Sequence, residues 1–314
     1  MNYRTLGKTG LDVSEVAVGC WQMGGVDGVN GWTGTNDKES VATIHRAQEI
    51  GINLLDTAEG YGKGHSEEVL GMALPGRRDK FIVATKVWLT SDDADPSNSR
   101  NRILEACEGS LERLKSDYID IYQLHSIPHD NAMPLVMETL AELKEQGKIR
   151  WFGISTNDVG AIRKLLALGD LATIQVGYNL LSRSGEEALE LAREENLGTL
   201  IRGPLASGAL SGRYNNTVPD LDEQDRRRRW WLSENSVAKF SKLPQLDFLL
   251  ADGKRTMVQA ALRFILDTPG VTAVIPGTKS RKQLEGNAGA AGVPSLTPEE
   301  RSKAIQVADL IGGM

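Results

Sequence analysis

The chain has 314 residues, of which 40% are hydrophobic and 25% are charged, a composition typical of a globular protein with a sizeable core. Its formal net charge is -6 and no Lys/Arg-rich face stands out, which argues against nucleic acid as a partner. The two cysteines, Cys20 and Cys107, are too few to cross-link a chain of this length and predict buried thiols in a reducing compartment.

The sequence also argues against a membrane protein. Residues 1–5 lack the basic-then-apolar pattern of a signal peptide. No apolar stretch approaches the roughly 20 residues that span a bilayer. We therefore expect a cytoplasmic protein with no membrane partner, and the sequence leaves its oligomeric state open.

The predicted elements alternate regularly after an N-terminal hairpin. Residues 3–13 predict two short strands around a Lys-Thr-Gly turn. Eight apolar or β-branched runs then predict strands at residues 16–19, 53–56, 81–85, 118–124, 151–155, 173–178, 198–202 and 272–275. Amphipathic patterns predict helices at residues 38–50, 66–74, 97–114, 135–146, 159–168, 186–194 and 257–266.

This alternation indicates an α/β fold with a parallel sheet and crossover helices. Eight strands is the number that closes a (β/α)8 TIM barrel, so we predict one barrel domain covering residues 1–314. Residues 211–253 form an insertion, which we expect to be a loop with some helix over the carboxyl-end face of the barrel. Residues 297–310 predict a last helix.

Four ionisable residues lie at or just past the carboxyl ends of predicted strands, where parallel α/β folds collect their chemistry: Asp56, Tyr61, Lys86 and His125. A free phenol has a pKa of about 10, and a nearby ammonium lowers it. Lys86 can supply that charge with Asp56 as its ion-pair partner. His125 can donate a hydrogen bond to a carbonyl oxygen as negative charge develops on it. Tyr61 is then the general acid of a carbonyl reduction.

The motifs around these residues resemble those of the aldo-keto reductases. The resemblance rests on residues 56–62 (DTAEGYG) with 66–71 (SEEVLG), on 84–87 (ATKV) and on 117–125 (DYIDIYQLH), in family order. It runs from about residue 3 to residue 287. It implies an oxidoreductase that transfers a hydride between a nicotinamide cofactor and a small aldehyde, ketone or sugar carbonyl, because no protein side chain donates a hydride.

The resemblance also implies residues that hold the nicotinamide. Ser155 matches the family's strand end, Thr156 stands where the family has Asn, and Asn157 follows one position later. Gln175 matches a carboxamide-binding glutamine. Arg202 replaces the aromatic residue that stacks on the ring, and its charge would favour the reduced cofactor over the nicotinamide cation.

Two further segments resemble the family's phosphate-binding parts. Residues 202–210 resemble its pyrophosphate loop, with Pro204, Leu205 and Ser207 as contacts. Residues 275–287 resemble the segment that binds the adenosine phosphate at a helix N-terminus. The residues implied there are Gly277, Lys279, Ser280, Arg281, Gln283 and Asn287. This chemistry suits a 2′-phosphate and favours NADPH, with NADH as a second cofactor because Gln283 stands where strongly NADPH-selective members carry Arg.

Three tryptophans, Trp21, Trp32 and Trp88, lie on or just after the first and third strand ends and are expected to line the substrate site. Residues 226–231 (RRRRWW) are unusual: they read either as a solvated helix face with tryptophans packed inward, or as a cover over the cofactor groove or substrate mouth.

Two other functions are alternatives to a carbonyl reductase. A protein of this fold with little activity could use bound NADPH to sense redox state for a partner, although four intact catalytic residues argue against it. A metal-dependent barrel enzyme is disfavoured, because the four histidines (His45, His65, His125 and His129) have no metal-ligand spacing. We therefore expect no metal.

Overall fold

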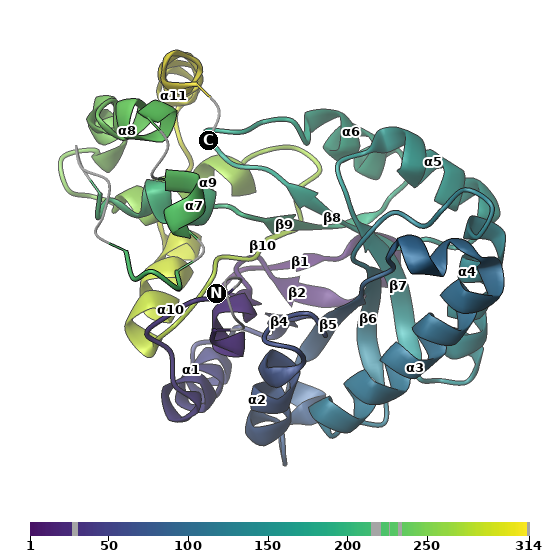
Figure 1. Cartoon of the computed structure of the whole chain (residues 1–314). Helices are drawn as coiled ribbons and strands as arrows, with labels where there is room; N and C mark the ends of the chain where they lie inside the picture. The colour runs from purple at the N-terminus through teal and green to yellow at the C-terminus, as the bar shows by residue number, and fades with distance from the viewer. Residues whose placement is uncertain (27–30, 215–220, 226, 232–233, 313–314) are drawn as a thin grey trace.

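The computed structural model describes residues 1–26, 31–214, 221–225, 227–231 and 234–312 (Figure 1). An antiparallel hairpin of β1 (Tyr3–Thr5) and β2 (Asp12–Ser14) precedes one parallel sheet. The strands of that sheet are β3 (Val18–Gly19), β4 (Leu54–Asp56), β5 (Ile82–Val87), β6 (Ile119–Leu124), β7 (Ile149–Ser155), β8 (Thr173–Gly177), β9 (Gly198–Arg202) and β10 (Ala273–Val274). Each pairs with its neighbour in chain order.

The first and last strands meet and close the sheet. Parallel bridges join Val16 to Val274 and Gly19 to Gly277, and the Gly19 N–H donates to the carbonyl oxygen of Pro276 at 3.1 Å. The predicted (β/α)8 barrel with its N-terminal hairpin is confirmed.

Helices surround the strands, as Figure 1 shows for α1 to α6. Their bounds are α1 (Asp37–Glu49), α2 (His65–Ala73), α3 (Pro96–Leu114), α4 (Met133–Glu145), α5 (Val159–Leu168), α6 (Glu186–Glu194), α9 (Met257–Leu266), α10 (Arg281–Ala288) and α11 (Pro298–Ile311). The predicted helix ends are correct to within two residues. Differences of two residues occur at the start of α4, where a proline occupies the first turn, at the starts of β3 and β7, and at the end of β5, which continues to Val87.

The barrel interior is filled in layers. Leu54, Ala84, Ile121, Leu200 and Ala273 form one buried cluster, which also contains two hairpin residues, so the hairpin closes the amino end of the barrel. Successive side chains of a strand point to opposite faces. The residues two positions after Leu54 and Ala84 therefore point the same way, one layer nearer the carboxyl ends, and these are Asp56 and Lys86.

The insertion contributes two short helices, α7 (Arg227–Trp231) and α8 (Glu234–Phe240), which lie to one side of the barrel in Figure 1. Gly31 bridges to Asp225, which joins the insertion to the loop after the first strand. Trp231 is buried, and its ring centroid lies 5.0 Å from that of Phe240, so this tryptophan packs inward as predicted. Arg226 lies outside the described residues.

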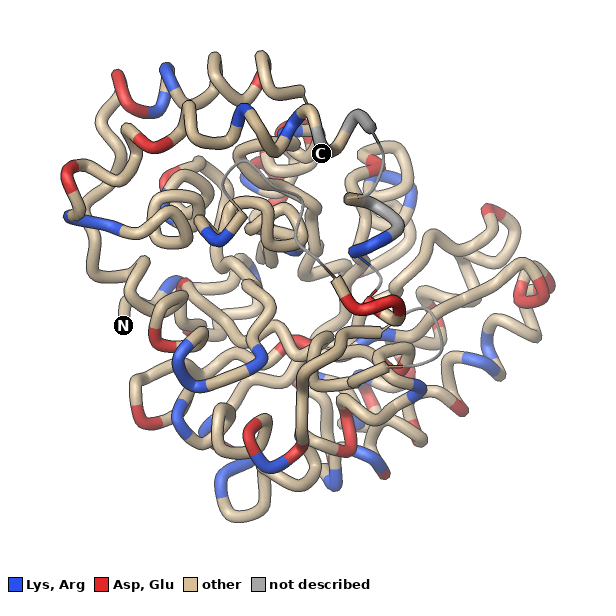
Figure 2. Tube along the Cα trace, turned by 60° about the vertical axis from the view of Figure 1, so that its left-hand side comes forward, with Lys and Arg blue, Asp and Glu red and all other residues tan. Residues whose placement is uncertain are grey.

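Figure 2 shows Lys and Arg interspersed with Asp and Glu over the chain. Cys20 and Cys107 are buried and form no disulfide. Within the described part of the chain, no helix is long and apolar enough to cross a membrane.

Candidate functional site

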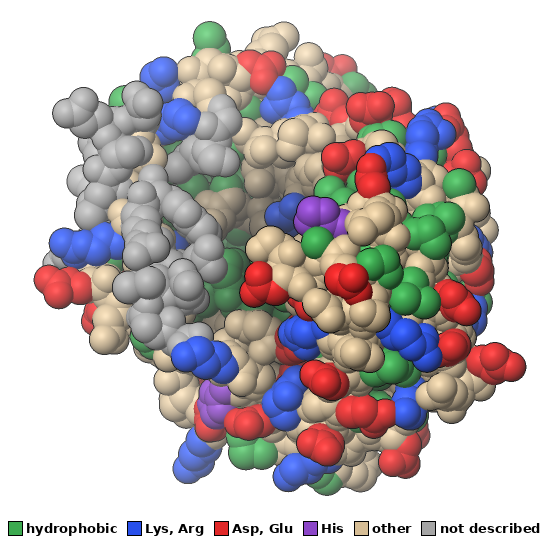
Figure 3. Space-filling view, turned by 45° about the vertical axis from the view of Figure 1, so that its right-hand side comes forward, with side chains coloured by type: hydrophobic (Ala, Val, Ile, Leu, Met, Phe, Trp, Pro, Cys, Tyr) green, Lys and Arg blue, Asp and Glu red, His purple; other side chains and the backbone are tan. Residues whose placement is uncertain are grey.

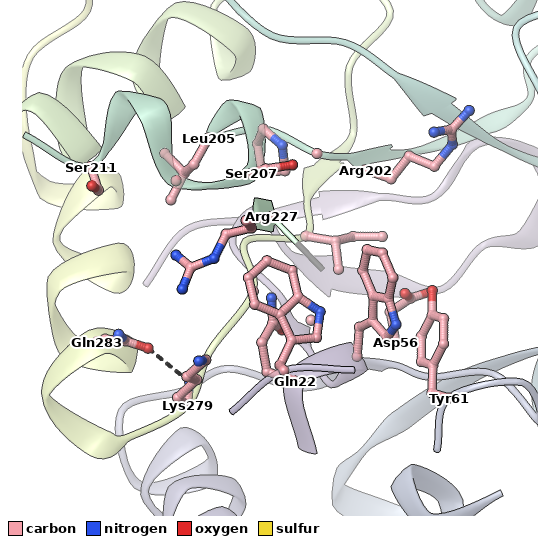
Figure 4. A pocket seen from close by; sticks show the side chains of 18 of the residues that line it. Gln22, Asp56, Tyr61, Arg202, Leu205, Ser207, Ser211, Arg227, Lys279 and Gln283 are labelled. Atoms are coloured by element: carbon pink, nitrogen blue, oxygen red, sulfur yellow. Dashed lines mark hydrogen bonds between the residues drawn. The ribbon is translucent and has the colours of Figure 1, made fainter. Parts of the chain in front are cut away.

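A cavity of about 840 Å³ opens at the carboxyl ends of the strands. Figure 3 shows a hollow on this face of the molecule. In the close-up of Figure 4, Asp56, Tyr61 and Arg202 lie toward one end, and Lys279 and Gln283 lie toward the other. The cavity is thus elongated, with the predicted catalytic groups at one end only.

Lys86 is fully buried behind the cavity and is held by three oxygen atoms. Its Nζ donates to Oδ1 and Oδ2 of Asp56, both at 2.9 Å, and to the carbonyl oxygen of Thr57 at 2.6 Å. Burial alone would lower the pKa of Lys86, but Asp56 and then Tyr61 raise it above its usual value. Lys86 therefore remains an ammonium ion.

Tyr61 follows β4 in the loop before α2 and lies over this ammonium. The Lys86 Nζ lies 5.1 Å from the centroid of the phenol ring, and Trp21 stacks on the same ring with centroids 5.5 Å apart. Burial raises the pKa of Tyr61, while the charge of Lys86 acts in the opposite direction. The phenol is consequently neutral at physiological pH, with a fixed cation beside it that stabilises the phenolate.

His125 follows β6 and lies beside the rings of Tyr61 and Trp88. Its ring centroid is 5.8 Å from that of Tyr61 and 4.9 Å from that of Trp88. Burial, followed by the charges of Lys86 and Arg202, lowers the pKa of His125 to about 3. Within the described residues, its Nδ1 has no hydrogen-bond partner. A neutral imidazole of this kind can donate one N–H to an oxygen atom in the cavity.

The three predicted tryptophans all line the cavity. Trp32 is 5% exposed and its Nε1 has no partner among the described residues, whereas Trp88 is 48% exposed at the mouth. Trp21 contacts both Trp32 and Tyr61, with its ring 5.6 Å from that of Trp32. The end of the cavity that holds Tyr61 is therefore lined by aromatic side chains.

The predicted nicotinamide-binding residues separate into two groups. Ser155, Gln175 and Arg202 line the cavity, and the amide nitrogen of Gln175 donates to Oδ1 of Asp56 at 2.7 Å. Asn157 does not line it: its amide donates to the carbonyl oxygen of Gly177 at 2.9 Å and accepts from the same residue's N–H at 2.7 Å. Asn157 thus joins the ends of β7 and β8.

The predicted phosphate loop lines the middle of the cavity through Pro204, Leu205 and Ser207. Ala206 and Ser207 have positive φ angles of 47° and 56°, which is uncommon for residues other than glycine. Successive residues in such conformations can turn backbone N–H groups toward one concave side, which suits an anion. The backbone here fits a phosphate group.

The far end of the cavity holds only part of the predicted adenosine-phosphate set. Gly277, Lys279 and Gln283 line it. Ser280 is the N-cap of α10 and accepts from the backbone of Gln283. Arg281 and Asn287 are engaged elsewhere: Arg281 pairs with Glu39, and the Asn287 amide donates to Thr278.

The cavity is also lined by residues that were not singled out as site residues from the sequence, among them Gln22, Arg213, Tyr214 and Arg227. Gln22 comes from a short helix after β3, and its Oε1 is buried with no partner in the described part of the chain. Arg227 pairs with Asp225 at 2.7 Å, and its guanidinium lies 5.0 Å from the Trp32 ring. The Arg/Trp run is therefore not simply a solvated face, because Arg227 reaches the cavity.

Among the described residues, no group of three or more His, Cys, Asp or Glu side chains could hold a metal ion. The orphaned polar atoms, the phosphate-type backbone turn and the cations at the far end fit an elongated organic cofactor that carries phosphate groups.

The chain is similar in sequence and in structure to known proteins. The chain is 36% identical over 300 residues to aldo-keto reductase YhdN of Bacillus subtilis, covering 91% of this chain and 87% of that protein. It is 33% identical over 307 residues to the NADH-specific methylglyoxal reductase of Escherichia coli, covering 92% and 93%. The crystal structure of an aldo-keto reductase from Klebsiella pneumoniae in complex with NADPH is similar with a TM-score of 0.75 and 27% identity, covering 100% of this chain and 97% of that one.

A sequence model of the family matches residues 15–308, which is nearly the whole chain and includes every strand of the barrel. The protein therefore belongs to the Aldo/keto reductase family.

Proposed function

We propose that this protein is an NAD(P)H-dependent oxidoreductase that reduces aldehydes, ketones or sugar carbonyls to alcohols, with Tyr61 as the general acid. The observation that carries the proposal is the buried Lys86 ammonium, held by Asp56 and lying 5.1 Å from the Tyr61 ring, at one end of the cavity. Two similar proteins support it, since one is described as an NADH-specific reductase and another was crystallised with NADPH.

The residues present fit the cofactor. Its nicotinamide would lie beside Ser155, Gln175 and Arg202, and its phosphates beside the backbone of Leu205 and Ser207 and beside Lys279. When bound, NADPH or NADH supplies the hydride. We expect NADPH to be used, with NADH as a second cofactor.

The chain's own groups perform the proton chemistry. Tyr61 donates its phenolic proton to the carbonyl oxygen, and Lys86 stabilises the phenolate that remains. The neutral His125 donates a hydrogen bond to the same oxygen as negative charge develops on it. In the reverse direction Tyr61 would act as the base for alcohol oxidation.

The test is consumption of NADPH and NADH by the purified protein with a panel of aldehydes, ketones and sugars. Tyr61→Phe should lose the activity while cofactor still quenches its tryptophan fluorescence. Cofactor binding without turnover on a broad panel would refute the enzymatic proposal and favour a redox-sensing role. Loss of activity on treatment with a chelator would restore the metal-dependent alternative.

A further inference from the structure

Arg202 occupies an unusual position at the catalytic end of the cavity. It is the last residue of β9, and its side chain is exposed whereas the four preceding residues are buried. It pairs in register with Gly177 on β8. A Cβ atom on Gly177 would lie 3.2 Å from Cζ and Nη1 and 3.3 Å from Nη2 of Arg202. These nearly equal distances mean that the guanidinium plane lies flat over Gly177, where a larger residue would press against it.

The guanidinium carries a charge that no neighbour neutralises. Within the described part of the chain, the Arg202 side chain makes no hydrogen bond or ion pair. The carboxylate at this end, Asp56, is already bound by Lys86 and Gln175. The catalytic end therefore holds two cations, Lys86 and Arg202, against one carboxylate.

This excess of positive charge lies where the cofactor must change its own charge. Tyr61 can protonate only a carbonyl next to it, so the ring that gives that carbonyl a hydride must lie at the same end of the cavity. The transfer removes two electrons and one hydrogen nucleus from the dihydronicotinamide and leaves a ring cation. The carbonyl gains the hydride and the Tyr61 proton and becomes an alcohol.

We propose that Arg202 makes the protein bind the reduced cofactor more tightly than the oxidised one, and so favours carbonyl reduction and release of the oxidised cofactor. The inference rests on the proposed function. A unit charge at several ångströms in a partly screened site changes the relative affinity of a cation and a neutral ring by about tenfold.

The test compares dissociation constants for NADPH and NADP⁺, measured by quenching of tryptophan fluorescence at equilibrium without any carbonyl substrate. In Arg202→Gln, the ratio of the NADP⁺ constant to the NADPH constant should fall by about tenfold, mainly through tighter NADP⁺ binding. Arg202→Lys keeps the charge and should keep most of the ratio.

Lys279→Gln is the matched control, because Lys279 lines the far end of the same cavity. The phosphates there have the same charge in both redox forms, so this variant should weaken both and leave the ratio unchanged. An unchanged ratio in Arg202→Gln would overturn the inference, as would an equal fall in Arg202→Lys. If the wild type turns over carbonyls but Arg202→Gln leaves the ratio of dissociation constants unchanged, only this inference fails. If it binds neither form, the proposed function fails as well.

Discussion

The Lys86 ammonium donates a hydrogen bond to each carboxylate oxygen of Asp56, both at 2.9 Å, deep below the Tyr61 ring. This pair is 0% and 6% exposed, so water screens it little. Its position on adjacent strands, one layer above the apolar barrel interior, fixes the cation relative to the phenol.

Replacing Lys86 should therefore remove the charge that stabilises the phenolate. We expect Lys86→Met to lower kcat/KM for carbonyl reduction by about a hundredfold or more. The dissociation constant for NADPH should change by less than about threefold, because Lys86 does not line the cavity.

Lys80→Met is the control for this variant, since Lys80 forms an exposed pair with Asp79 before the amino end of β5, away from the cavity, and such pairs contribute little. It should retain full activity and stability. Wild-type activity in Lys86→Met would contradict the role assigned to Lys86.

The neutral state of His125 makes stability depend on pH. Its pKa falls from the usual value near 6.5 to about 3 in the folded protein, first because of burial and then because of Lys86 and Arg202. The unfolded chain therefore takes up a proton below pH 6.5 that the folded chain does not, so stability falls as pH drops from 6.5 toward 3.

His125→Gln removes this dependence. Between pH 7 and pH 5 the wild type should lose about 2 kcal/mol more unfolding free energy than this variant, as urea titrations at the two pH values would measure. His129→Gln serves as the control, because His129 is exposed and does not line the cavity, and this variant should follow the wild type. Equal pH dependence in His125→Gln and the wild type would show that the folded imidazole protonates normally.

We predict that Glu39 weakens the binding of NADPH relative to the binding of NADH. Its Oε1 accepts from the backbone N–H of Arg281 at 3.1 Å, and its Oε2 lies 3.1 Å from the Arg281 Nη2. A carboxylate thus occupies the start of α10, where the resemblance implies that the 2′-phosphate of NADPH binds. The two anions would repel each other and compete for the same donors.

We expect Glu39→Gln to raise the affinity for NADPH relative to NADH by about fivefold. Competitive fluorescence titrations with the two reduced cofactors measure this ratio. Glu49→Gln is the matched control, because Glu49 lies on the same helix but pairs with Arg46. A shift in Glu49→Gln equal to that in Glu39→Gln would show that net charge alone causes it.

The sequence was sufficient to predict the barrel and to place the four proposed catalytic residues at strand ends, because both follow from local patterns. Each predicted apolar run forms a strand. Asp56, Lys86 and His125 lie at or just after the carboxyl ends of three of these strands, which fixes their positions. The cofactor residues were harder to predict, because side-chain partners come from distant segments. The pairing of Asn157 with Gly177 and of Arg281 with Glu39 could not be read from motif order.

The same reason explains why the sequence did not single out Gln22, and why it named Arg227 only within a run that had two alternative interpretations. Gln22 stands beside a predicted site residue, Trp21, but a lone Gln carries no distinctive signal. Arg227 belongs to an insertion whose path is set by tertiary contacts, including the bridge between Gly31 and Asp225. Two signals indicated that the insertion covers the cavity: its position before the seventh helix, and the run of residues 226–231 within it.

The loop that carries Tyr61 depends on a close approach between two backbones. Gly62 has a φ of +62°, and a Cβ atom there would lie 2.0 Å from the carbonyl oxygen of Gly24. Gly62→Ala is therefore strained and forces the two loops apart, since a backbone oxygen cannot rotate away. Gly60, one residue before Tyr61, has no atom within 4 Å of a Cβ placed on it.

Gly62→Ala should lose about 2 kcal/mol of unfolding free energy, and its kcat should fall by about tenfold or more because Tyr61 is displaced. Gly60→Ala should stay within about 0.5 kcal/mol of the wild type. Urea unfolding and steady-state assays of the two alanine variants separate a requirement for this backbone contact from a general need for flexibility. If flexibility mattered instead, both variants would lose activity together, and the contact between Gly62 and Gly24 would not be what positions the phenol.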